Sequence, residues 1–196
     1  PPAMEYLLSL GEVKIDGFIC PGHVSTVIGV EPYVPLSEKY GVPQVIAGFE
    51  PLDVLSAIYM LLLQLRNGEA KVENEYRRSV RQRGNEKAKR MMEEVFEVCD
   101  IAWRGIGPIP RSGFRLRREF EQFDAVKKFD LDVSGLEYRV PPGCRCGEVL
   151  RGLIYPQECP LFNKACTPER PVGPCAVSIE GACSIAMRYG GRPISP

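Results

Sequence analysis

The sequence predicts an α/β protein, with a partial parallel sheet in its first part and a small cysteine-rich unit after it. Short apolar runs of strand type alternate with segments whose apolar residues recur at helical spacing, which is typical of a parallel sheet. Six of the eight cysteines fall in the last 53 residues, just after the turn signal Pro141-Pro142-Gly143. We therefore expect an α/β region over residues 1–140 and a cysteine-rich domain over residues 141–196.

The first fifty residues alternate helix and strand. Helical segments are expected at residues 3–10, 24–28 and 31–40, and strands at residues 15–19 and 45–47. The last of these is a short, wholly apolar run closed by a glycine, as in a buried strand. This order predicts two neighbouring strands joined by helices.

The strongest predicted helix begins at Pro51, because proline suits the first helical position and Asp53 favours the positive helix N-terminus. It ends at Asn67-Gly68. Its apolar residues recur at helical spacing and are Leu52, Leu55, Ile58, Tyr59, Leu62 and Leu63. This spacing predicts an amphipathic helix.

Four further segments precede the cysteine-rich unit. Residues 74–80 read as a strand or extended arm, residues 85–98 as a helix, residues 103–109 as a strand and residues 116–129 as a helix. The first of these helices carries its apolar side at Met91, Met92, Val95 and Phe96.

Composition excludes several classes of protein. Lys plus Arg and Asp plus Glu are both 25, so a strongly basic nucleic-acid binder is not expected, and the arginines at 77–83 and 115–118 read as solvated faces. The apolar run 58–63 is far shorter than a membrane span, so no membrane association is expected. No signal peptide is evident, which favours a cytoplasmic location. The chain opens at Pro1 without an initiator methionine, so we expect a processed or truncated piece.

The cysteine spacing allows three kinds of site. Six cysteines permit a disulfide framework, which a cytoplasmic location disfavours. Structural zinc usually uses Cys-x2–4-Cys pairs, and here no Cys-x2-Cys occurs. An iron–sulfur cluster needs four thiolates and tolerates irregular spacing. Spacing does not choose between zinc and a cluster, and two spare cysteines beside a cluster could form a redox-active dithiol.

A second candidate site follows the first predicted strand at residues 20–25. His23 is the only histidine, and its loop lies where ligands bind in open α/β sheets, although a lone histidine is more often structural. Glu50 follows the next strand and either faces the same crevice or serves as the N-terminal carboxylate of the helix. Cys20 and Cys99 read as packing residues.

Several segments, in chain order, resemble the HypD family of hydrogenase maturation proteins. They are GFICPGHVS at 17–25, AGFEPLD at 47–53, WRGIG at 103–107 and CRCGEVL at 144–150. The tail continues the resemblance with CPLF at 159–162, ACTP at 165–168 and VGPC at 172–175. The resemblance extends from the first residues to about residue 190.

The resemblance implies a redox-active scaffold, rather than a turnover enzyme, that assembles the Fe(CN)2CO part of the nickel–iron hydrogenase site. It implies the chaperone HypC and the cyanide-supplying protein HypE as partners. It also implies two α/β domains and a C-terminal domain that holds a 4Fe-4S cluster beside a thiol pair. Transient iron with CN and CO ligands would be handled in the full-length protein.

The resemblance also implies roles for individual residues. The expected cluster ligands are Cys144, Cys159, Cys166 and Cys183. Cys146 and Cys175 would be the extra dithiol, relaying electrons through the cluster to thiols elsewhere in the family's chain. His23 would donate a hydrogen bond or a proton in the central cleft. The residues expected to bind the iron unit in that cleft are Pro21, Gly22, Ser25 and Glu50.

Three family motifs are absent: Cys-Gly-Thr-His, Gly-Pro-Gly-Cys-Pro-x-Cys and Gly-Phe-Glu-Thr-Thr. The chain therefore resembles the C-terminal half of the family, and the missing N-terminal half of the same protein would be needed to hold the Fe(CN)2CO unit. Two alternatives stay open. They are an iron–sulfur thiol–disulfide oxidoreductase and a zinc-stapled interaction module with no redox role.

Overall fold

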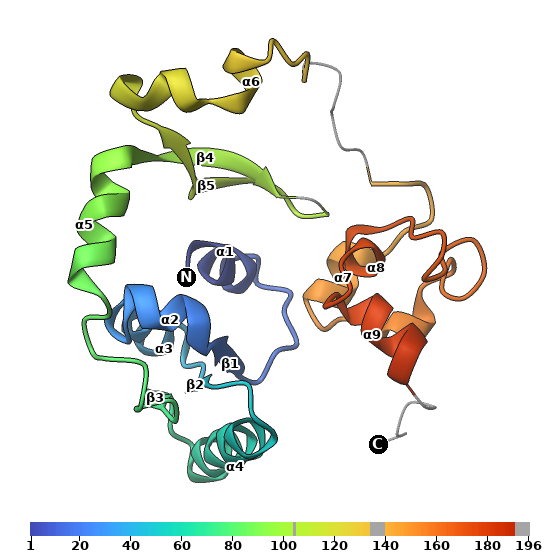
Figure 1. The fold of residues 1–196 in the computed structure, drawn as a ribbon. Coiled ribbons are helices and arrows are strands. Elements are labelled where there is room, and N and C mark those ends of the chain that lie inside the picture. The colour runs from blue at the N-terminus through green and yellow to red at the C-terminus, as the bar shows by residue number, and fades with distance from the viewer. Residues whose placement is uncertain (104, 134–139, 191–196) are drawn as a thin grey trace.

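The computed structural model describes residues 1–103, 105–133 and 140–190. The fold is α/β, as the sequence predicts (Figure 1). A three-stranded parallel sheet with its helices comes first, an antiparallel hairpin follows, and short helices rich in cysteine end the described chain.

The elements follow one another with short connections. In the first part they are α1 (Pro2–Ser9), β1 (Phe18–Pro21), α2 (Gly22–Ile28), the 3-10 helix η1 (Glu31–Tyr33), α3 (Val34–Tyr40), β2 (Gln44–Ala47), α4 (Pro51–Asn67) and β3 (Val72–Asn74). Then come α5 (Glu86–Val95), β4 (Phe96–Trp103), β5 (Gly107–Leu116), η2 (Arg118–Phe123) and α6 (Ala125–Lys128). The cysteine-rich part holds α7 (Cys146–Leu150), η3 (Pro156–Glu158), α8 (Pro174–Val177) and α9 (Ala182–Tyr189).

The parallel sheet has the order β1-β2-β3, so β2 is its central strand. All four residues of β2 are buried, as expected for an apolar strand covered on both faces. The one polar residue of that strand is satisfied, because the Gln44 amide donates to the Tyr33 carbonyl and the Ser37 hydroxyl, both at 2.8 Å. The carboxyl ends of the three strands therefore meet at one edge.

Helix α4 forms where the sequence predicts it, but it presents a different face to the sheet. Ala57 packs against the central strand, and the residues packed with it are Met60 and Leu61. Most of the predicted apolar stripe is exposed: Leu52 73%, Leu55 63%, Ile58 39%, Tyr59 63% and Leu62 58%. Small Ala57 lets the helix approach the sheet closely, so the larger side chains point away from it.

The hairpin β4–β5 was not predicted. The helix expected over residues 85–98 ends at Val95, and the strand expected at 103–109 is instead the turn between two antiparallel strands. Phe96, Val98 and Ile101 find cross-strand partners, and this pairing outweighs the helical spacing of the segment. The helix expected at 116–129 is two short helices, η2 and α6. The predicted extended arm at 74–80 keeps only Asn74 in a strand, at the end of β3.

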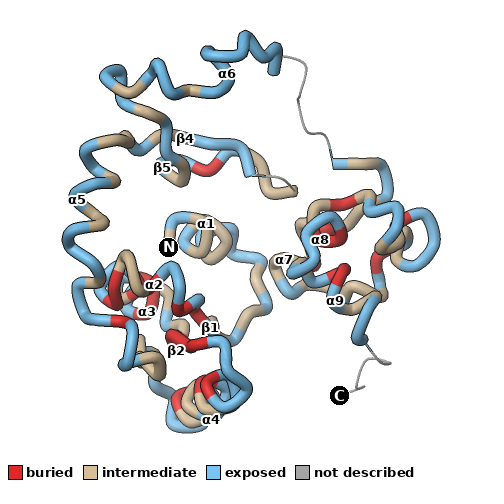
Figure 2. The backbone as a smooth tube through the Cα atoms, in the orientation of Figure 1, coloured by how far each residue is buried: buried red, intermediate tan, exposed pale blue. Residues whose placement is uncertain are grey.

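Buried residues fall into separate groups (Figure 2). Two of them flank the parallel sheet, and the third lies among α7, α8 and α9. The amide of Lys14 donates to the carbonyl of Arg151 at 2.9 Å, which ties the segment before β1 to the cysteine-rich part. The predicted domain boundary after residue 140 stays a prediction.

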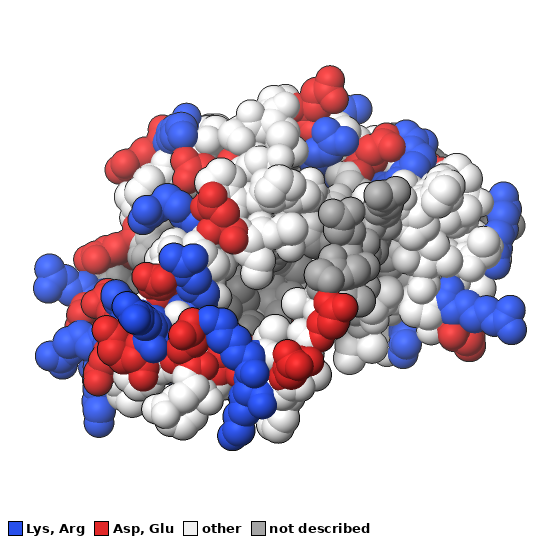
Figure 3. All heavy atoms as spheres, turned by 90° about the horizontal axis from the view of Figure 1, so that it is seen from above, with Lys and Arg blue, Asp and Glu red and all other residues white. Residues whose placement is uncertain are grey.

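The surface shows no area dominated by one charge on the face drawn in Figure 3, where basic and acidic side chains lie side by side. This agrees with the zero formal net charge. Over the described ranges, none of the helices has the length and apolar character that crossing a membrane requires.

Candidate functional site

Five cysteines of the C-terminal part surround one small cavity. Its walls are formed by Cys144, Cys159, Leu161, Phe162, Cys166, Gly173, Cys175, Cys183 and Met187. All eight cysteines of the chain are free thiols, and only Cys144 of these five is more than 8% exposed. We call Cys144, Cys146, Cys159, Cys166, Cys175 and Cys183 the cysteine cluster. The structure thus brings residues 40 positions apart in the sequence into one buried group.

The first turns of three helices present half of these thiols. Cys146 and Cys175 begin α7 and α8, and Cys183 is the second residue of α9. Cys159 directly follows η3. Such positions place free main-chain N–H groups close to the sulfur atoms, because the first turn of a helix leaves its amides unpaired. Thiolate character is favoured there.

The sulfur atoms of three cysteines interact directly. The Sγ atoms of Cys175 and Cys183 lie 3.1 Å apart, and the Cys146 thiol hydrogen-bonds the same Cys175 sulfur. The main-chain N–H of Cys175 also donates to Sγ of Cys146 at 3.3 Å. A disulfide bond is near 2.05 Å, so these are contacts between free thiols.

These contacts divide the acidities within the cluster. Hydrogen bonds from the thiols of Cys146 and Cys183 hold the pKa of Cys175 well below its ordinary value. The pKa values of Cys146 and Cys183 are raised, first because each thiol shares a hydrogen bond with the Cys175 sulfur and then because both are buried. Burial raises the pKa of the Cys144 thiol. Cys175 is therefore the sulfur most readily present as a thiolate.

The surroundings suit an iron–sulfur cluster. Main-chain amides donate to three of the sulfurs: Val172 to Cys166 at 3.4 Å, Cys175 to Cys146, and Cys146 to Cys144. Such N–H···S hydrogen bonds tune cluster potentials. The hydroxyl of Ser184, beside Cys183, is buried and has no partner in the part of the chain described. The wall is otherwise apolar, so the donor set and the dry cavity fit a thiolate-bound cluster.

Over those same residues, no group of three His, Cys, Asp or Glu side chains is placed to hold a single metal ion. The cysteines line a common cavity rather than converging on one point. All four predicted ligands and Cys175 border that cavity, and Cys146 does not.

The second predicted site lies at the carboxyl edge of the sheet. His23 follows β1 and its ring lies over that of Phe49, with 5.3 Å between the ring centres. Phe49 and Glu50 follow β2, and both are exposed. The main-chain N–H of Glu50 donates to the Asp53 carboxylate at 3.3 Å. Glu50 is the N-cap of α4, so the helix-terminal alternative describes its position.

The other residues predicted for this edge hold its backbone. Ser25 is buried, and its hydroxyl donates to the Pro21 carbonyl at 2.8 Å and pairs with the Tyr33 hydroxyl at 3.1 Å. Gly22 packs so closely against the Tyr76 ring that an added Cβ would lie 2.7 Å from it. Pro21 is exposed. Cys20 is buried as predicted, and burial raises its pKa to about 12.

Sequence reasoning missed three residues of this edge. Asp53 accepts two hydrogen bonds from the Arg78 guanidinium, at 2.9 and 2.6 Å, and this pairing lowers the pKa of Asp53. Arg78 also lies over the Tyr76 ring, 4.5 Å from its centre. Arg78 was taken for part of a solvated face. Its place after the third strand was the signal, because parallel strands bring their following loops together.

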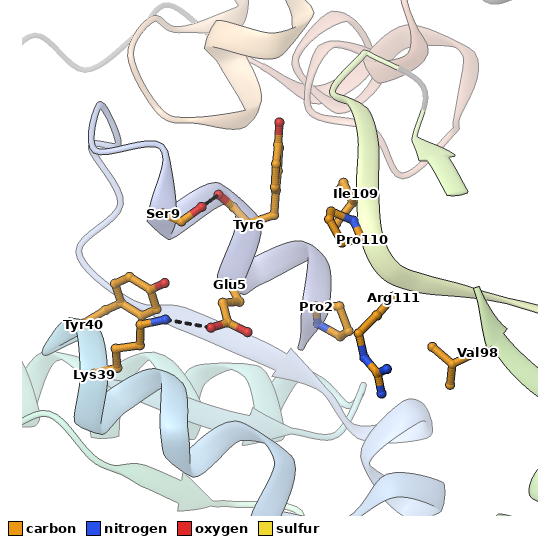
Figure 4. A pocket seen from close by; sticks show the side chains of 10 residues that line it. All are labelled: Pro2, Glu5, Tyr6, Ser9, Lys39, Tyr40, Val98, Ile109, Pro110 and Arg111. Atoms are coloured by element: carbon orange, nitrogen blue, oxygen red, sulfur yellow. Dashed lines mark hydrogen bonds and ion pairs between the residues drawn. The ribbon is translucent and has the colours of Figure 1, made fainter. Parts of the chain in front are cut away.

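A separate cavity of about 540 Å³ lies between α1, the end of α3 and the hairpin (Figure 4). Lys39 donates to Glu5 across its floor at 2.9 Å. Arg111 borders it from the hairpin with a positive φ of 52°, and its main-chain N–H donates to Asp100 at 2.8 Å. No motif in the sequence pointed to this cavity.

Comparison with known proteins gives one consistent result. The profile of the HypD family, described as "Hydrogenase formation hypA family", matches residues 1–190. The chain is 48% identical over 200 residues to the hydrogenase maturation factor HypD of Cupriavidus necator, covering 97% of this chain and 52% of that protein. It is 47% identical over 197 residues to the hydrogenase expression/formation protein HupD of Azotobacter chroococcum, covering 97% and 51%.

A Methanocaldococcus jannaschii protein with a provisional name, hydrogenase expression/formation protein, is 50% identical over 189 residues. That match covers 96% of this chain and 52% of the relative. The chain spans about half the length of the curated relatives it matches.

Proposed function

The chain belongs to the HypD family, and from this premise we propose that it acts in the maturation of nickel–iron hydrogenases. Its part would be the redox-active portion of a scaffold that assembles the Fe(CN)2CO centre. The observation that carries the proposal is the cysteine cluster, five of whose thiols border one buried cavity. Family membership alone would leave the contribution of this half of the protein open.

In this proposal Cys144, Cys159, Cys166 and Cys183 hold a 4Fe-4S cluster. All four thiols border the cavity, and N–H···S hydrogen bonds reach two of them. When bound, the cluster would supply one-electron transfer at a potential set by those hydrogen bonds and by burial. The apolar walls keep water from the site.

Cys146 and Cys175 would form the neighbouring dithiol. Their thiols share a hydrogen bond, and Cys175 is the one with the lowered pKa. Oxidation of the pair to a disulfide would release two electrons and two protons, so the pair would store two electrons beside a one-electron centre. Cys175 also borders the cavity, which places the dithiol next to the proposed ligands.

At the carboxyl edge, His23 would donate a hydrogen bond or a proton to the transient iron unit with its CN and CO ligands. Exposed Pro21, Glu50 and His23 can face such a cargo. Buried Gly22 and Ser25 would position the loop instead, because the Ser25 hydroxyl is already paired. His23→Ala in the full-length protein should leave cluster content unchanged and abolish maturation. Normal hydrogenase activity would exclude His23.

The proposed partners are the chaperone HypC, the cyanide-supplying protein HypE and the half of the family's chain that this sequence does not span. That half is needed because the relatives are about twice as long as this chain. Co-purification of tagged full-length protein with HypC and HypE tests this part of the proposal.

Direct contact between the sulfurs of Cys146, Cys175 and Cys183 favours a second candidate, an iron–sulfur thiol–disulfide oxidoreductase acting on protein disulfides. It predicts turnover with a disulfide acceptor in the absence of the maturation partners. A zinc-stapled module would be colourless and would show no such turnover.

The deciding experiment is the anaerobic iron, sulfide and zinc content of the purified chain, with its visible spectrum. About four iron and four sulfide per chain, with a broad absorption near ~400 nm, is the expected result. One zinc and no colour, unchanged after reconstitution with iron and sulfide, would contradict the proposed cluster.

A further inference from the structure

The turn of the β4–β5 hairpin lies against the cysteine cluster. A Cβ built on Gly105 would lie 3.6 Å from Sγ of Cys146 and 2.8 Å from Cγ of Pro174. From the other side, a Cβ built on Gly147 would lie 3.1 Å from the carbonyl oxygen of Gly105. Two segments about 40 residues apart therefore meet at the thiol that does not border the cavity.

We propose that Gly105 is a positioning residue that seats the hairpin turn on the Cys146 thiol and shields it from solvent. The inference rests on the proposed function, in which Cys146 belongs to the dithiol rather than to the ligand set. Three observations carry it. Cys146 is 1% exposed, Gly105 touches it, and Gly105 has a backbone φ of +79°, which disfavours any residue with a side chain.

The chemistry explains why such a shield matters. A thiol pair that stores electrons must react with its intended partner and not with small oxidants or thiols in solution. Access to the sulfur controls those side reactions as strongly as acidity does. The turn covers the Cys146 side of the pair, while the cavity wall covers the Cys175 side.

The sequence offers a matched control in the same turn. Gly107 also has a positive φ, +106°, so alanine there strains the backbone in the same sense. No atom lies within 4 Å of a Cβ built on Gly107. Gly105→Ala and Gly107→Ala therefore share the backbone penalty, and only the first adds a methyl group at the contact with Cys146 and Pro174.

The test is the rate at which N-ethylmaleimide labels each cysteine in the reduced, anaerobic, metal-loaded protein, resolved by mass spectrometry. Gly105→Ala should speed labelling of Cys146 about tenfold, and Gly107→Ala should change it less than about twofold, because only the first opens the contact locally. Cys99, half-buried in β4, serves as the internal reference. Iron content is measured on every sample.

Two results would overturn the inference, and they differ from each other. Equal acceleration in both variants, or acceleration at all cysteines together, would mean that Gly105 serves only the turn. If Cys146 stays unlabelled in every variant until iron is removed, Cys146 is itself a ligand. The proposed division of the cysteines then fails as well.

Discussion

Cys159 is the residue at which the proposed ligand set is most easily tested. It is 8% exposed and borders the cavity, and no hydrogen bond from the dithiol pair reaches it among the described contacts. Cys159→Ala should lower iron from about four per chain to below about one, because a cluster bound by three thiolates is readily lost. Metal analysis and the visible spectrum of the purified variant give the answer.

Cys99→Ala is the matched control for this experiment. Cys99 is a free, half-buried thiol in β4 that does not border the cavity. Its replacement should leave iron content unchanged. Full iron content in Cys159→Ala would show that a different set of four cysteines holds the cluster.

The pairing of Asp53 with Arg78 makes stability depend on pH. Hydrogen bonds from Arg78 lower the pKa of Asp53, so this carboxylate binds a proton less readily in the folded chain than in the unfolded one. Its contribution is fully present above the unfolded value of about 3.9 and is lost as pH falls through the lower folded pKa. Asp53→Asn should therefore destabilise the protein at pH 6 and much less at pH 3.

Urea unfolding of both proteins at pH 6, 4 and 3 measures this difference. The gap between the two midpoints should narrow as pH falls. A gap of constant size would assign the effect to lost packing or to the start of α4, where Asp53 accepts from the Glu50 amide, rather than to the charge pair.

At the scale of elements, helix α5 depends on one polar side chain at its start. Asn85 Oδ1 accepts the Ala88 amide at 3.0 Å, and no residue of α5 is buried. Asn85→Ala should lower the free energy of unfolding by about 1 kcal/mol, as for other N-cap losses, because little packing compensates. Asn85→Asp should restore most of it, since aspartate caps equally well. Urea unfolding would contradict this if both variants matched the parent chain.

The elements that the sequence predicts well are those whose signals are local. Helix α4 shows this, because Pro51 and Gly68 mark its ends in the sequence and the helix runs from Pro51 to Asn67. Its orientation was not predictable. The apolar stripe through Leu55 and Leu62 is exposed in a chain about half the length of its relatives. Which face of a helix is buried depends on neighbours that spacing does not reveal.

The hairpin β4–β5 shows the opposite failure. Helical spacing continues past Val95 in the sequence, but pairing with residues of β5 holds Phe96 and Val98 in a strand. Local preference yields to such non-local contacts. The candidate sites divide in the same way. Cysteine count identified the cluster region, whereas the Asp53–Arg78 contact required the fold, because 25 positions separate the two residues.

At the scale of the whole molecule, the two parts of the chain are stabilised differently. The parallel sheet has an apolar centre in Val45, Ile46 and Ala47. In the cysteine-rich part, four of the six residues of the buried group are cysteines, and the others are Val149 and Ala176. A unit of this size with so small an apolar core depends on staples or metal for its stability.

Removing the metal should therefore unfold one part and spare the other. Anaerobic chelation of iron should raise amide exchange in residues 144–190 by at least about tenfold, while β1 and β2 keep their protection, because metal binding and folding are coupled in small metal-bound units. Hydrogen exchange with mass spectrometry follows both parts in one sample. The change should end near the hydrogen bond from Lys14 to Arg151, where the parts meet. Equal protection of residues 144–190 with and without iron would mean that thiol packing alone stabilises this part, and the cluster would then be a passenger on a preformed scaffold.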